Sequence, residues 1–199
     1  MKIIKQSIII ISFVMSVLTC GWSAEDAQKA VIDLVTQIQS IVKAGGSQDQ
    51  YKPILLQYLD FDEISRRVLD GVRKEIKNAK DAKTAQKEIN EFLPTFIPIF
   101  TDYMIKKYSK PDITEKFKNM TFKIGNSAEN GKYMLINSTL KSEADSLGDM
   151  KIEWKTLSGK VVDMVFSDAS ASLFRNEASE ATAKYKMAGS LDGLLKQYS

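Results

Sequence analysis

Four short segments decide the fold: MTFKI (120–124), YMLINSTL (133–140), MKIEWKTL (150–157) and KVVDMVF (160–166). Each alternates apolar with polar side chains and is rich in β-branched or aromatic residues, which is typical of a strand with one buried face. Asn130-Gly131 and Ser158-Gly159 supply the chemistry of tight turns, and residues 141–148 form a longer polar connection. The segments therefore predict a curved, mostly antiparallel sheet of four strands or slightly more.

One face of this sheet is predicted to be apolar. Side chains at alternate positions of a strand leave the same side of the sheet, so each segment contributes one row. The rows are Met120, Phe122 and Ile124; Met134, Ile136 and Leu140; Met150, Ile152 and Trp154; and Val162, Met164 and Phe166. Such a wall is either an ordinary hydrophobic core or the lining of a cavity, and the alternation does not separate these two interpretations.

Helical periodicity flanks the strands on both sides. Apolar residues at steps of three and four predict the following helices: 25–43, a second after Ser47, 63–76, a fourth from Asp81 to Tyr108, 171–187 and a short one within 191–198. Helices that precede and follow a run of hairpins indicate an α+β fold.

The helix from Asp81 to Tyr108 is the most apolar of the set, and we expect it to cover the apolar face of the sheet. Pro94 and Pro98 interrupt its pattern. An interior proline removes a backbone donor and clashes with the preceding turn, at a cost of about 3 kcal/mol. We therefore expect a break or a kink near residues 92–95.

The first 23 residues are typical of an export signal. Lys2 and Lys5 precede an apolar core over residues 8–18, which is shorter than the roughly 20 residues of a membrane span. Small residues follow this core, so cleavage is expected near Ser23 or Ala24. Lipid attachment at the cysteine of this segment is an alternative, although the residues before it lack the usual small pair.

Composition excludes several classes of function for the expected mature domain over residues 24–199. Cys20 is the only cysteine and histidine is absent, so the mature chain lacks the residues of Ser-His or Cys-His catalysis and the commonest ligands of zinc and copper. The signal holds two lysines and no acid, so its removal lowers the net charge from +3 to +1. We expect a non-enzymatic protein without metal or cofactor, and no binding of nucleic acid, which usually needs a basic patch.

Three strings carry a resemblance to one family: YLDFDEISRRVLDGV (58–72), VVDMVFSDASASLFRNEA (161–178) and GSLDGLLKQY (189–198). They are similar to sequences of the MlaC family, which are also called toluene-tolerance or auxiliary organic-solvent-tolerance proteins. The similarity extends over about residues 28–199.

The resemblance implies a monomeric periplasmic carrier in which helices cover an NTF2-like sheet. Phospholipid tails would lie inside, and the headgroup would stay exposed. The implied partners, contacted transiently, are an outer-membrane lipoprotein complex and an inner-membrane ABC transporter with an MCE-domain protein, in a system that maintains outer-membrane lipid asymmetry. The residues expected to contact the tails are Phe96, Phe100, Tyr103, Met104, Phe122, Ile124, Met134, Ile136, Ile152, Trp154, Val162, Met164 and Phe166.

Two polar features have other interpretations. Asp163 and Arg175 match family positions, but Asp163 lies on the strand face opposite to Met164, which favours a structural role in capping or pairing. Arg66 and Arg67 indicate either a docking patch or a solvated helix face.

Two other functions stay open. One is an adaptor with a solid core that recruits partners through its surface. The other is an NTF2-like enzyme that moves protons with acids in a cavity. Glu153 and Asp163 alternate away from the apolar face, so the predicted inner rows contain no acid for such an enzyme.

Overall fold

The computed structural model describes residues 23–110, 118, 120–142, 149–167 and 171–199, so all but the last residue of the expected export signal lies outside the described residues. The elements in chain order are α1 (Ala24–Lys43), α2 (Gln48–Tyr58), α3 (Phe61–Val68), α4 (Asp70–Ala79), α5 (Ala82–Tyr108), β1 (Met120–Asn130), β2 (Tyr133–Ser142), β3 (Met150–Leu157), β4 (Lys160–Phe166), β5 (Ala171–Ser172), α7 (Leu173–Ala188) and α8 (Leu191–Lys196).

The strands form one antiparallel sheet in the order β1-β2-β3-β4-β5, in which β5 adds only two residues. The predicted α+β fold and antiparallel meander are confirmed. Gly131 and Gly159 take φ values of 61° and 73° in the two predicted turns, a backbone region that glycine occupies without steric cost. The register pairs Ile136 with Trp154 and Trp154 with Met164, so the predicted apolar rows share one face of the sheet.

A bulge interrupts the alternation of β4. The register shifts so that Thr156 pairs with Val161 and Lys155 pairs with Asp163, which leaves Val162 between two paired positions. Val161 belongs to the hydrophobic core cluster, whereas Val162 is buried outside that cluster. The extra residue explains why a strict period of two misplaces this one position.

The helix predicted over residues 63–76 is divided, so the prediction of one helix was wrong. Leu69 ends α3 and its N–H bonds the carbonyl oxygen of Ser65, after which α4 begins. Gly71 follows the division and lies against α7, where an added Cβ would come within 2.0 Å of Thr182 Oγ1. This glycine therefore permits the close approach of α4 and α7.

The break expected near residues 92–95 is absent, because α5 continues for 27 residues with both prolines inside it. Pro94 and Pro98 are exposed. A proline at position i has no N–H to bond the carbonyl oxygen of residue i−4. Because both prolines lie on the exposed side of α5, water can reach these carbonyl oxygens.

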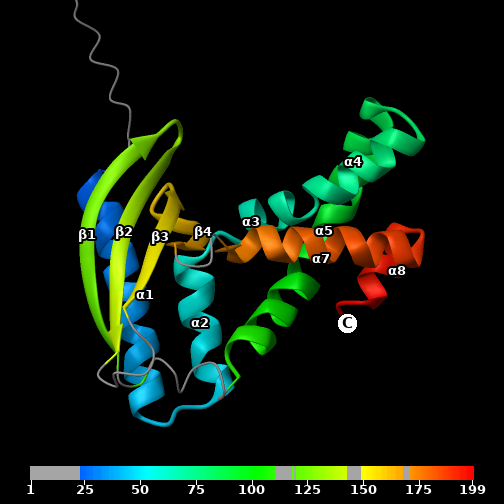
Figure 1. The fold of residues 1–199 in the computed structure, drawn as a ribbon. Helices are drawn as coiled ribbons and strands as arrows, with labels where there is room; N and C mark the ends of the chain where they lie inside the picture. The colour runs from blue at the N-terminus through cyan, green and yellow to red at the C-terminus, as the bar shows by residue number, and fades with distance from the viewer. Residues whose placement is uncertain (1–22, 111–117, 119, 143–148, 168–170) are drawn as a thin grey trace, which may run out of the picture.

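Figure 1 shows the curved sheet at one side of the molecule, with α1 and α2 against it and the other helices extending away from β4. Helix α1 contacts β1, β2 and β4, and α2 contacts β4. Helix α4 packs on α5 and α7, and α8 packs on α5 and α7. Two layers thus meet at β4, where α3 and α7 both contact the sheet.

Candidate functional site

An apolar cavity of about 290 Å³ lies between the sheet and the helices. Its floor comes from β2, β3 and β4, and its walls come from α1, α2, the last turn of α5 and the start of α7. The lining residues are Val35, Ile38, Gln39, Tyr51, Leu55, Leu59, Phe61, Met104, Tyr108, Ser109, Leu140, Ile152, Trp154, Met164, Phe166, Leu173 and Phe174. The volume is near the lower end of the range of about 300–1,000 Å³ for ligand pockets.

Polar atoms of three lining residues are bonded to partners in the protein. The indole Nε1 of Trp154 donates to Ser138 Oγ at 2.7 Å, and Ser109 Oγ donates to the carbonyl oxygen of Ile105 at 2.5 Å. The hydroxyl of Tyr108 donates to Glu177 Oε1. Because these groups are satisfied within the protein, the cavity offers a ligand mainly apolar contacts.

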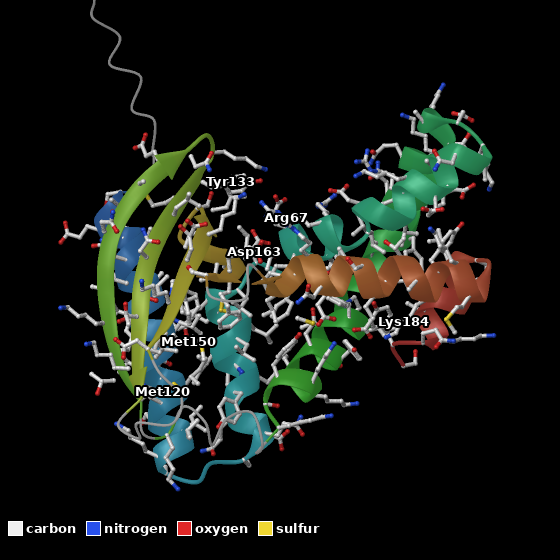
Figure 2. All side chains as sticks on the ribbon, in the orientation of Figure 1. Arg67, Met120, Tyr133, Met150, Asp163 and Lys184 are labelled. Atoms are coloured by element: carbon white, nitrogen blue, oxygen red, sulfur yellow. The ribbon has the colours of Figure 1, made fainter. Side chains whose placement is uncertain are left out.

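A charged network behind the cavity joins the end of α5 to α7. Lys107 Nζ lies 2.8 Å from Glu177 Oε1 and 2.9 Å from Glu180 Oε2, and the side chain of Glu177 is only 2% exposed. Lys184 Nζ lies 2.8 Å from Glu180 Oε1, and Figure 2 shows Lys184 on α7. These contacts hold α7, whose first residues line the cavity, against α5.

The electrostatics of this network keep its charges in place. Burial acts to raise the pKa of Glu180, but hydrogen bonds from Lys184, Lys107 and Tyr103 outweigh burial and lower this pKa to about 2. Burial likewise acts to lower the pKa of Lys107, and its hydrogen bonds to Glu177 and Glu180 raise it well above its ordinary value. Both groups are therefore charged at neutral pH.

The comparisons with known proteins identify the family. The family model described as MlaC protein matches residues 25–198. The chain belongs to the MlaC family. Among solved structures, the fold is similar to that of a phospholipid-binding protein from Ralstonia solanacearum in complex with a phospholipid, with a TM-score of 0.62 and 14% identity over 87% of this chain and 94% of that chain. No curated protein matches the chain.

The structure places only some of the residues expected to contact lipid in the cavity of this MlaC-family chain. Five of them line it: Met104, Ile152, Trp154, Met164 and Phe166. Phe122 and Ile124 line a different hollow, between α1 and β1. Ile136 is fully buried in the core cluster, and the half-buried Met134 packs against the same cluster.

The aromatic residues of α5 lie elsewhere. Phe96, Phe100 and Tyr103 contact the ring of Tyr198 at centroid distances of 5.5, 5.6 and 4.8 Å. At 27 residues α5 is about 40 Å long, which is longer than a strand of the sheet. Only its last turns reach the cavity, so these three residues pack with the C-terminal end of the chain.

Sequence reasoning missed the walls of the cavity. Ile38 on α1 and Tyr51 and Leu55 on α2 lie on the predicted apolar helical faces, but the periodicity does not say which helix covers the sheet. Leu173 and Phe174 belong to a segment that resembles the family, and their apolar character was the available signal.

Asp163 has a structural role, as predicted from its place on the strand face opposite to Met164. Its carboxylate accepts hydrogen bonds from Ser172 Oγ at 2.9 and 2.8 Å and from its neighbour Met164 N at 2.8 Å. Ser172 in turn caps α7 by accepting from Arg175 N at 3.0 Å. Figure 2 shows Asp163 where the sheet meets α7, so this carboxylate fixes the start of a helix that lines the cavity.

The two neighbouring arginines, Arg66 and Arg67, differ in exposure and in contacts. Arg66 is exposed, whereas Arg67 makes an ion pair of 3.2 Å with Glu63 and lies over the ring of Tyr133 at 4.7 Å. Figure 2 shows Arg67 and Tyr133 facing each other across the gap between α3 and β2. Arg67 thus joins a helix to the sheet.

Two further observations bear on the kind of protein. None of the helices in the described part of the chain has the length and apolarity needed to cross a membrane. Among the described residues, no three or more His, Cys, Asp or Glu side chains lie together in an arrangement that could hold a metal ion.

Proposed function

We propose that the protein carries phospholipid, with the fatty-acid tails held in the apolar cavity. The observation that carries this proposal is the composition of the lining, in which the polar groups of Trp154, Tyr108 and Ser109 are bonded within the protein. Membership of the MlaC family and the fold shared with a phospholipid-binding protein support it.

The energetics of transfer make such a cavity useful. Each methylene that leaves water for an apolar site gains about 0.8 kcal/mol, so a free phospholipid scarcely leaves its bilayer. A cavity lined by side chains such as Ile152 and Met164 replaces the bilayer at a similar free energy, so loading and release stay reversible. A membrane partner then sets the direction by binding one state of the carrier better than the other.

The proposed setting is the periplasm, which the chain enters after removal of its first 23 residues. There it acts as a monomer, without catalysis, and shuttles lipid between an outer-membrane lipoprotein complex and an inner-membrane ABC transporter carrying an MCE-domain protein. The system maintains the lipid asymmetry of the outer membrane. Among the expected tail contacts, those that line the cavity are the primary candidates.

Native mass spectrometry of protein purified gently from bacterial cells tests the proposal. The expected spectrum contains a population heavier by the mass of a phospholipid, and thin-layer chromatography of the extracted lipid identifies its class. Folded protein that carries no phospholipid, and takes none from vesicles, would contradict the carrier and favour the adaptor function.

A further inference from the structure

A second hollow, of about 500 Å³, lies between α1 and the edge strand β1. Its apolar side is formed by Ile32, Phe122 and Ile124, and its polar side includes Gln39, Lys43 and Lys118. We call it the outer hollow. Among the described residues, this lining includes the two lysines and no carboxylate.

The outer hollow adjoins the apolar cavity. Gln39 lines both spaces. Phe122 on the outer side meets Trp154 on the cavity side edge to face, with ring centroids 6.5 Å apart, and it pairs directly with Leu140, which also lines the cavity. A single layer of side chains therefore separates the two spaces.

Two glutamines attach α1 to β1 beside this layer. Gln39 Nε2 donates to the carbonyl oxygen of Met120 at 2.7 Å, and Gln28 Nε2 donates to that of Gly125 at 3.2 Å. Both donors are side-chain amides at partly exposed positions, where water can replace either partner. The layer at Gln39 can therefore open without disrupting a ladder of the sheet.

The chemistry of the outer hollow matches the part of a phospholipid that the cavity cannot accommodate. A phospholipid joins apolar tails to an anionic phosphate, and the two adjoining spaces offer an apolar interior and a rim that includes Lys43. Lys43 is exposed in the last turn of α1. Ammonium groups make strong charge-assisted hydrogen bonds with phosphate oxygens.

We infer that the outer hollow holds the phosphate end of the cargo, next to Lys43, and that the tails enter the cavity past Gln39. This inference rests on the proposed function and adds the place and chemistry of headgroup binding.

A rival opening exists on the other side of the cavity. This third hollow, of about 440 Å³, shares Leu59 and Phe61 with the cavity. Three carboxylates border it: Asp60, Asp62 and Asp102. Two lysines also border it, Lys52 and Lys160, and Lys52 is paired with Asp102 at 2.7 Å. The three carboxylates outnumber these two lysines, so the charges here disfavour an anionic phosphate.

Photo-crosslinking distinguishes the two openings. Ile32 and Leu56 are apolar side chains of similar exposure, 38% and 43%, and each lines one of the two hollows. Purified protein with p-benzoylphenylalanine in place of either residue is loaded from vesicles that contain phosphatidylethanolamine with biotin on the headgroup. The inference predicts a biotinylated adduct at position 32 and little at position 56.

The outcomes separate the inference from the proposed function. Three outcomes would overturn the inference alone, in protein that native mass spectrometry shows to be loaded. They are equal adducts at the two positions, a stronger adduct at position 56, and no adduct at position 32. Protein that binds no lipid at all would overturn both.

A charge reversal provides a second test. Lys43→Glu is expected to weaken the binding of phosphatidylglycerol about threefold to tenfold, as for the loss of one partly solvated ion pair. The matched control is Lys77→Glu, because Lys77 is also an exposed lysine in the last turn of a helix but lies outside all three hollows. Equal affinities for the two variants would contradict the place assigned to the phosphate.

Discussion

Trp154 on β3 donates its indole N–H to the hydroxyl oxygen of Ser138 on β2 at 2.7 Å. Both side chains are buried, and Ser138 Oγ in turn donates to the carbonyl oxygen of Ile152 at 3.3 Å. The bond explains how a large side chain with one polar atom can form the floor of an apolar cavity. It also ties together the two central strands beneath the proposed cargo.

Removal of this acceptor is expected to destabilise the protein. Ser138→Ala leaves the indole donor buried without a partner, which costs about 1–3 kcal/mol in the free energy of unfolding. Urea denaturation measures this loss. In the background of Trp154→Phe the indole donor is already gone. Ser138→Ala should therefore lower the free energy of unfolding clearly less in that background than in the wild type. Equal losses from Ser138→Ala in both backgrounds would show that the bond contributes little.

Bulk added to the cavity wall should exclude cargo. Ile38 lines the cavity, and Ile41 lies further along the same helix outside the lining. Ile38→Trp is expected to reduce the lipid-bound fraction seen by native mass spectrometry, whereas Ile41→Trp should keep the wild-type fraction. Circular dichroism checks that both variants are folded. The same lipid load in folded protein of both variants would place the tails elsewhere.

Acid is expected to weaken the attachment of α7 to α5. The pKa of Glu180 is about 2 in the folded protein and near 4.5 when the chain is unfolded, so its ion pairs stabilise the fold above about pH 4.5. This contribution is lost as the pH falls from 4.5 towards 2. Urea midpoints at pH 6 and pH 3 should therefore differ less for Glu180→Gln than for the wild type.

The control for this pH dependence is Glu91→Gln, because Glu91 is 66% exposed and its nearest ion-pair distance is 3.8 Å to Lys87. That variant should keep the pH dependence of the wild type. An unchanged difference between the two midpoints in Glu180→Gln would contradict the role given to this carboxylate.

Tyr198 is expected to contribute to stability and not to cargo binding. Its ring is 5% exposed and packs edge-on against Phe96, Phe100 and Tyr103. Tyr198→Ala should cost about 3–5 kcal/mol, as for other large aromatic side chains in a core. The lipid load of the remaining folded protein should stay unchanged. A variant of wild-type stability that loses its lipid would show that this aromatic cluster belongs to the binding site.

The fold was predictable from the sequence where the signal is local. Alternation and turn residues belong to the segments themselves, so the four strands and their apolar face could be derived from residues 120–166. The bulge at Val162 could not, because a bulge depends on the register with the neighbouring strand. The close approach of α7 to Gly71, just after the division at Leu69, likewise joins segments far apart in the sequence.

The candidate site was predictable only in part, for a related reason. The floor of the cavity follows from alternation, and Ile152, Trp154 and Met164 lie where that pattern puts them. The walls depend on which helices cover the sheet, and an amphipathic pattern does not name its partner. Phe100 was therefore expected above the sheet, although it packs against Tyr198.

Quenching of Trp154 fluorescence tests most directly whether fatty-acid tails lie in the cavity. The sequence contains two tryptophans, so in protein that begins at Ala24 the cavity residue Trp154 is the only one. Loading with phospholipid brominated along its acyl chains should quench this fluorescence, whereas the same lipid without bromine should not. Native mass spectrometry shows which samples carry the brominated lipid. If Trp154 fluoresces in those samples as strongly as in lipid-free protein, the tails do not lie in the cavity.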